Sequence, residues 1–192
     1  MHTTRLHITG ASGIGTTTLG RALASALAVP HHDTDDYYWH PTSPPYRQER
    51  AVADRLRLMQ EVFLDRPDWV LSGSLDEWGK PVVPLFNLVV FLRVPTAIRL
   101  QRLRLREAQH FGRDVVAPGG WRFQETEDFI EWASHYDDGT REGRSLPRHL
   151  RWLDTLRCPV LRLDGIRPIA QLVNEILAAF ADAATTPSGT SD

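Results

Sequence analysis

The sequence is short of several features that define whole classes of protein. Its 192 residues include one cysteine, Cys158, so no internal disulfide can form. No apolar run approaches the roughly 18 residues needed to cross a bilayer, and the formal net charge of −2 creates no overall attraction to nucleic acid or acidic membranes. The eight histidines lack metal-ligand spacing, so a structural zinc is not expected. We therefore expect a cytoplasmic protein without a membrane, nucleic-acid or obligate protein partner.

Composition and periodicity predict a single α/β domain. Hydrophobic residues make up 42% and charged residues 24%, which is ordinary for a globular chain. The unbroken apolar runs at 69–72 and 88–94 are typical of strands buried on both faces of a parallel sheet. Strands alternate with helices, which indicates a doubly wound parallel sheet of about five strands. We expect the domain to span residues 1–184 and residues 185–192 to be a disordered tail.

The expected elements follow this alternation. Strands are expected at 6–9, immediately before 32–36, and at 69–72, 88–94 and 160–163. Helices are expected at 17–28, 47–65, 96–110, 124–136, 146–156 and 168–183, with irregular structure at 41–46 and 111–120.

A glycine-rich loop joins the first expected strand to the first expected helix. Gly10 and Gly15 are separated by four residues, which suits a loop whose backbone N–H groups converge on a phosphate. Thr17 stands where a hydroxyl can join a Mg²⁺ shell, or can cap the helix. Thr16 occupies the position where the P-loop motif has lysine. The predicted phosphate-binding residues are Gly10, Ala11, Ser12, Gly13, Ile14, Gly15, Thr16, Thr17 and Thr18.

The same glycines also resemble the dinucleotide turn of short-chain dehydrogenases, Thr-Gly-x3-Gly-x-Gly. The segment from Thr9 to Gly15 is one residue too short for that pattern. Those enzymes also need a Tyr-x3-Lys pair, and the single lysine, Lys80, follows Asp76 at this spacing. We therefore prefer the phosphate-binding interpretation.

An acidic segment, Asp33-Thr-Asp-Asp36, follows the second expected strand near the sheet edge where ligands bind. Phosphoryl transfer needs one carboxylate near Mg²⁺ and another to position or deprotonate an acceptor hydroxyl. Asp33 suits the first role and Asp35 the second. A solvated, helix-capping acidic turn is the alternative. The aromatic residues 37–39 are either a wall of an acceptor pocket or part of the core.

Two groups of arginines are candidates for binding phosphate. Arg99, Arg102 and Arg106 share one face of an expected helix, which either grips ATP or is a solvated basic face. Arg141 and Arg144 lie in a glycine-flanked segment that resembles a mobile lid. Any of these arginines, or the single lysine, could replace the charge absent at position 16, and the sequence does not choose among them.

Together these motifs resemble the adenylate kinase and shikimate kinase group of P-loop kinases, most of all the small bacterial adenylate-kinase-like topology-modulation proteins. The resemblance covers nearly the whole chain. Asp33-Thr-Asp35 is similar to the Asp-Thr-Asp of shikimate kinases, and residues 94–106 are similar to the stretch that enters the adenylate kinase lid. Residues 163–165 look like the loop that cups adenine, which adds Gly165 to the nucleotide site. Ser72-Gly73 stands where adenylate kinases have Asp-Gly, so no acceptor is implied.

The resemblance implies a P-loop NTPase fold of the nucleoside monophosphate kinase type, with ATP and Mg²⁺ as cofactors. Thr17 and Asp33 would hold the metal, and Asp35 would orient a small-molecule acceptor, either a nucleotide or a hydroxyl metabolite. The catalytic arginines would be Arg102, Arg106, Arg141 and Arg144. Residues 36–66 would form an acceptor-binding flap and residues 107–145 a lid. The alternatives are a non-catalytic nucleotide-binding protein and a slow NTPase that acts with a partner.

Overall fold

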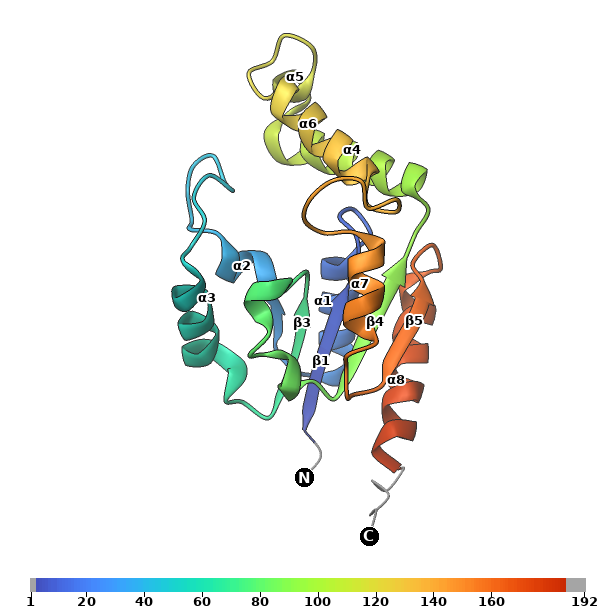
Figure 1. Ribbon diagram of the computed structural model, residues 1–192. Helices are drawn as coiled ribbons and strands as arrows, with labels where there is room; N and C mark the ends of the chain where they lie inside the picture. Colours follow the sequence, from blue (N-terminus) through green and yellow to red (C-terminus); the bar gives the residue numbers. More distant parts are fainter. Residues whose placement is uncertain (1–2, 186–192) are drawn as a thin grey trace.

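Five parallel strands form one sheet in the computed structural model, which describes residues 3–185 (Figure 1). Their order is β2-β3-β1-β4-β5, and every neighbouring pair is parallel. The strands are β1 (Thr4–Thr9), β2 (His31–Asp33), β3 (Asp68–Ser72), β4 (Leu88–Arg93) and β5 (Val160–Asp164). The predicted doubly wound sheet of five strands is confirmed.

The strand order places a topological switch at the carboxyl end of β1. From β1 the chain runs to β2 and β3 on one side of the sheet, and then crosses to β4 and β5 on the other. Ligands of open α/β sheets bind where the direction of winding reverses. The glycine loop follows β1 at this point.

Each face of the sheet buries its own hydrophobic core, because successive side chains of a strand point to opposite faces. Leu6 and Ile8 of β1 are fully buried against α1 (Thr16–Leu27) and α8 (Ile169–Thr185). His7 lies between them on the opposite face and stacks on Phe86, with ring centroids 4.8 Å apart. That second core includes side chains of α7 (Leu146–Leu153) and the segment before β3.

The segment between β2 and β3 differs from the single helix predicted at 47–65. It contains α2 (Thr34–Tyr38), α3 (Val52–Met59) and a π-helical turn, η1 (Gln60–Leu64). Residues 47–51 are not helical, because Arg50 N–H groups donate to the carbonyls of Tyr37 and Trp39, both at 3.1 Å, and hold this stretch against α2. Long-range contacts therefore override the local helical pattern here.

Three helices rise beyond the carboxyl edge of the sheet (Figure 1). They are α4 (Thr96–Phe111), α5 (Arg113–Val116) and α6 (Phe123–Ser134). The irregular stretch predicted at 111–120 was wrong in part, since it contains α5. Leu103, Ile130 and Ala133 form a third small core that fastens α4 to α6. This helical group therefore has its own packing, separate from the two cores of the sheet.

The remaining elements are two short turns between strands. Two 3₁₀ turns, η2 (Glu77–Gly79) and η3 (Val83–Leu85), connect β3 to β4. Among residues 3–185, no helix combines the length and apolar character needed to span a bilayer. Apart from residue 185, the tail predicted at 185–192 lies outside the described residues.

Candidate active site

The glycine loop has the backbone conformation that a phosphate cradle requires. Gly13 and Gly15 have φ values of 78° and 100°, which L side chains rarely adopt. A Cβ on Gly13 would also come within 2.6 Å of the Arg99 carbonyl oxygen and 2.7 Å of Leu103. α1 then begins at Thr16 without a side-chain cap, so its first N–H groups are available to an anion.

The three threonines that follow the loop have different surroundings. Thr17 Oγ1 donates to Asp33 Oδ2 at 2.6 Å, so the structure brings together the two residues that the sequence assigns to a metal. Thr16 is half-buried and Thr18 is exposed. Ala11 and Ile14 are buried, and Ser12 is half-buried.

Asp33 is the centre of a hydrogen-bond network that links three elements. Ser72, at the end of β3, also donates to Asp33 Oδ2, at 3.1 Å. Because that bond uses the only hydroxyl hydrogen of Ser72, His31 Nε2 must be the donor in its 3.0 Å contact with Ser72 Oγ. Burial lowers the pKa of His31, which favours a neutral ring. This role of Ser72 was not predicted from the sequence, where the one usable signal was a serine at the end of an expected strand.

Asp33 also begins α2, so it has the capping role that the sequence left as an alternative. Its Oδ1 accepts the backbone N–H of Asp35 at 3.1 Å, while Oδ2 faces Thr17. Thr34 Oγ1 links the start of α2 to the segment after β3, because it accepts the N–H of Ser74 at 3.0 Å. The preceding residue, Gly73, has no room for a Cβ, which would lie 1.9 Å from Thr34 Oγ1.

The carboxylate of Asp35 is open to solvent but has protein on most sides. Desolvation and the neighbouring Asp33 raise the pKa of Asp35, and the positive charges of Arg144 and Arg106 oppose this rise. The structure therefore brings these two predicted arginines towards Asp35. A carboxyl with a raised pKa beside two cations is suited to accept a proton from a ligand hydroxyl.

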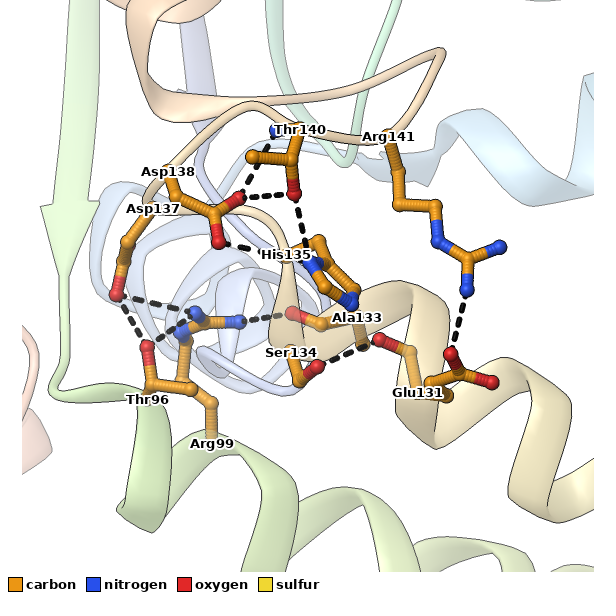
Figure 2. Close-up of polar contacts among 10 residues, drawn as sticks. All are labelled: Thr96, Arg99, Glu131, Ala133, Ser134, His135, Asp137, Asp138, Thr140 and Arg141. Atoms are coloured by element: carbon orange, nitrogen blue, oxygen red, sulfur yellow. Dashed lines mark hydrogen bonds and ion pairs between the residues drawn. The ribbon is translucent and has the colours of Figure 1, made fainter.

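Arg99 does not belong to the predicted row of phosphate-binding arginines. Its side chain is 1% exposed, because the packing of α6 and the following loop covers this face of α4. The guanidinium donates to the Val94 carbonyl. It also donates to the Ala133 carbonyl and contacts Thr96 and Asp137, as Figure 2 shows. Arg99 is therefore a structural clamp between the start of α4 and the end of α6.

The other candidate cations differ in the contacts that their side chains already make within the protein. Arg102 reaches back to the glycine loop, where Nη1 donates to the Ile14 carbonyl at 3.2 Å. Arg106 bonds to its neighbour Glu107 at 3.1 Å. Arg141 pairs with Glu131 on α6 (Figure 2). Lys80 pairs with Glu77 and is largely exposed.

Arg144 differs from these four cations. Within residues 3–185, no ion pair or hydrogen bond holds its guanidinium, and its Nε is buried without a partner. Its charge acts on Asp35 and on Tyr136, which lines the neighbouring cavity. Of the candidate cations, Arg144 is thus the one best able to pair with a bound anion.

A cavity of about 460 Å³ adjoins the glycine loop, a volume typical of small-molecule sites. Its walls come from the loop, the end of β4, the segment after α6 and the end of β5. They include Ala11, Ile14, Val94, Tyr136, Asp137, Leu163, Asp164 and Ile166. Gly165 lies between two lining residues, Asp164 and Ile166, where its N–H donates to the Arg93 carbonyl at 2.8 Å and a Cβ would lie 2.8 Å from Val94.

The donor set beside the glycine loop fits a Mg²⁺ ion that is held partly by a nucleotide. No cluster of three or more His, Cys, Asp or Glu side chains suited to a metal occurs in the described part of the chain. The Thr17 hydroxyl and the Asp33 carboxylate are hard oxygen donors, and Mg²⁺ commonly completes such a shell with phosphate oxygens and water. The site therefore suits an ion that arrives with its nucleotide.

Comparison with known proteins finds a relative of similar length. No family model matches the sequence. The uncharacterized protein YqaC of Bacillus subtilis (strain 168) is 41% identical over 172 residues, which cover 90% of this chain and 94% of YqaC.

Solved structures share the fold at much lower identity. A shikimate kinase from Acinetobacter baumannii in complex with shikimate has a TM-score of 0.58, 16% identity and 96% coverage of both chains. A gluconokinase from Sinorhizobium meliloti 1021 has a TM-score of 0.52, 20% identity and coverage of 95% of this chain and 94% of its own. The chain therefore belongs to the family of Bacillus subtilis YqaC and has the fold of the P-loop kinases that are related to adenylate kinase.

Proposed function

We propose that the protein is a Mg²⁺-dependent kinase that transfers the γ-phosphoryl group of ATP to a small acceptor. The observation that carries this proposal is the 2.6 Å contact between Thr17 and Asp33 at the start of α1, directly beside the exposed Asp35. It joins a phosphate cradle, a pair of metal-binding oxygens and a candidate base at one edge of the sheet. The kinase fold of the solved neighbours supports the proposal at this general level.

Each group has a distinct proposed task. The N–H groups of residues 10–18 bind the phosphates, and the cavity bordered by Gly165 takes the base. Bound ATP supplies the phosphoryl group, and Mg²⁺ neutralises its oxygens. Thr17 and Asp33 hold the ion, while Asp35 orients the acceptor and takes its proton. The raised pKa of Asp35 favours this role, because a base is most effective when its pKa approaches the working pH.

We further propose that arginines replace the lysine absent at position 16. The Arg144 guanidinium is not held by an ion pair or hydrogen bond in the described part of the chain, and its charge and that of Arg106 on α4 both act on Asp35. Arg102 is held against the glycine loop, where it can contact the nucleotide. Arg141 would have to leave Glu131 to take part. In this scheme residues 107–145 act as the lid and residues 36–66 as the acceptor flap of a single domain.

A non-catalytic nucleotide-binding protein is the second candidate. Thr16 favours it, because the residue at this position normally brings a positive charge to the β- and γ-phosphates. The two candidates agree on ATP binding and differ on turnover.

Calorimetric titration with MgATP, together with ADP production over a panel of nucleotides and small alcohols, separates the candidates. We expect MgATP to bind and at least one acceptor to accelerate ADP release. Arg144→Gln should lower kcat by about 10²-fold or more with little change in ATP affinity, since its charge acts on the transferring group. Arg151→Gln, which alters an exposed arginine of α7, is the matched control.

Tight ATP binding without turnover of any acceptor would overturn the kinase proposal and favour the second candidate. Absence of nucleotide binding would overturn both.

A further inference from the structure

The arginines of the flap, residues 36–66, are already engaged within the protein. Arg50 donates to two backbone carbonyls of residues 37–39 and contacts His40. Arg55 is buried, donates to the Arg50 carbonyl at 2.6 Å and to Glu49 at 3.2 Å, and stacks on Tyr38 with its Cζ 3.6 Å from the ring centroid. Neither guanidinium is available to a ligand without dismantling the flap.

The other three arginines of the flap point elsewhere. Arg47 forms a 3.0 Å ion pair with Glu125 of α6 and lies over the Trp121 ring. Arg57 pairs with two exposed acidic residues of its own helical segment. Arg66 precedes β3 and so lies at the amino ends of the strands, opposite the edge that carries Asp35. The flap thus offers no free cation towards the candidate site.

An aromatic side chain faces the site from the flap instead. Tyr46 adopts a left-handed backbone conformation, with φ of 64°, which is uncommon for a residue other than glycine. Its ring centroid lies 5.9 Å from that of Trp39 and 6.0 Å from that of His110 on α4. Burial raises the pKa of Tyr46, and the charges of Asp35 and Arg106 also act on its phenol, which agrees with a position on the side of the flap that is turned towards α4. Strained backbone of this kind is often found where a side chain is aimed at a ligand.

We infer that the acceptor is a neutral polyhydroxyl compound, rather than a carboxylate or a nucleoside monophosphate. This inference rests on the proposed kinase function. An anionic acceptor needs a cation of its own, and it would meet the carboxylates of Asp33 and Asp35. In the proposed function the charges of Arg144 and Arg106, which both act on Asp35, serve the transferring phosphate. A neutral polyol instead finds a carboxylate and a phenol as hydrogen-bond partners and aromatic rings as an apolar wall.

The transfer step then balances without a further reactant. The acceptor hydroxyl oxygen forms a bond to the γ-phosphorus while the bond from this phosphorus to the bridging oxygen of ATP breaks. The hydroxyl proton passes to Asp35, and ADP leaves with the bridging oxygen. The acceptor becomes a phosphate monoester.

A panel of neutral and anionic acceptors tests the inference. Glycerol, xylitol, sorbitol and myo-inositol represent neutral polyols, and gluconate, shikimate, AMP and CMP represent anions. Phosphoryl transfer from MgATP is followed by phosphorus NMR, which distinguishes a new monoester from free phosphate. We expect at least one neutral polyol to exceed every anion in kcat/KM by about tenfold or more, the effect of one unpaired charge contact.

An anionic acceptor with the higher kcat/KM would overturn the inference while leaving the kinase proposal intact. Transfer to an anion but to none of the neutral polyols also counts against it. Transfer to no acceptor of either kind, or loss of MgATP binding, would instead overturn the proposed function, so the two failures are distinguishable.

A tyrosine variant tests the position of the acceptor. Tyr46→Phe keeps the ring and removes the hydroxyl, so the KM for the polyol should rise by about two- to tenfold, as for the loss of one neutral hydrogen bond. The KM for ATP should not change. Tyr38→Phe makes the same change in a flap tyrosine whose ring lies under the Arg55 guanidinium, and it should leave both values unaltered. Equal behaviour of the two variants would show that Tyr46 does not contact the acceptor.

Discussion

At the scale of single residues, the two oxygens of Asp33 have separate tasks. Oδ1 accepts the N–H of Asp35 and begins α2, whereas Oδ2 accepts the hydroxyls of Thr17 and Ser72. A helix cap and a metal ligand are commonly treated as competing interpretations of an aspartate. Here they coexist, because capping uses one oxygen and leaves the other directed at the start of α1. The cap in turn fixes the position of Asp35.

The charge of Asp33 should therefore contribute more to the affinity for MgATP than to the affinity for ATP alone. Asp33→Asn keeps the shape of the side chain, so we expect the affinity for MgATP to fall by about tenfold or more, the worth of one charge-assisted contact. Binding of ATP in the presence of EDTA should change little. Calorimetry with and without the metal measures both values.

Asp36→Asn is the matched control for this prediction. It removes the same charge from the residue directly after Asp35, where the charges of His31 and Arg21 act on the carboxylate. An equal loss of MgATP affinity in the two variants would mean that only the overall negative charge of α2 matters, and would contradict a specific role for Asp33.

At the scale of elements, local patterns predicted the strands and the glycine loop well, because apolar runs and glycine spacing act through the backbone of their own segment. They failed where distant contacts decide the structure. Residues 47–51 are pinned to α2 by Arg50, and Arg99 is buried by a loop more than thirty residues later in the chain. Ser72 meets Asp33 because β2 and β3 are neighbours, and sequence spacing does not reveal this.

Arg99 should hold the α4–α6 group in place. Its planar guanidinium contacts the Val94 and Ala133 carbonyls and the side chains of Thr96 and Asp137. The single ammonium group of lysine cannot reproduce these contacts. We expect Arg99→Lys to lower the free energy of unfolding by about 2 kcal/mol, since buried acceptors lose their donors. Urea denaturation followed by circular dichroism gives the value.

The same variant should weaken ATP binding, because Tyr136 and Asp137 line the cavity beside the glycine loop. Arg104→Lys alters an exposed arginine of α4 that pairs with Glu127, and a surface pair of this kind contributes little. It should therefore remain close to the unmodified protein in both measurements. A stability loss in Arg104→Lys as large as in Arg99→Lys would contradict the clamp.

At the scale of the whole molecule, neutral histidines are built into the second core. His7 stacks on Phe86 and contacts the Leu71 carbonyl, and burial lowers the pKa of His7 to about 3. Burial also lowers the pKa of His149, to about 3, where its Nδ1 lies 2.7 Å from the Tyr136 hydroxyl. The folded protein thus keeps uncharged rings that the unfolded chain protonates near its ordinary pKa of 6.5. Acid should therefore weaken the fold well before carboxylates titrate.

The sign of this effect follows from proton uptake. Between the unfolded and folded pKa values the unfolded chain binds more protons, so the stabilisation is complete above about pH 6.5 and is lost as the pH falls towards 3. From about pH 7.5 to about pH 5, His7 alone should account for a loss of about 2 kcal/mol in the free energy of unfolding.

His7→Gln retains an N–H that can reach Leu71 but does not titrate, so the free energy of unfolding of this variant should depend less steeply on pH. Asp35 and Asp36 act in the opposite direction through their raised pKa values, but they are present in both proteins and cancel in the comparison. Urea denaturation at the two pH values measures both slopes, and equal slopes would show that His7 is not the residue through which acid acts.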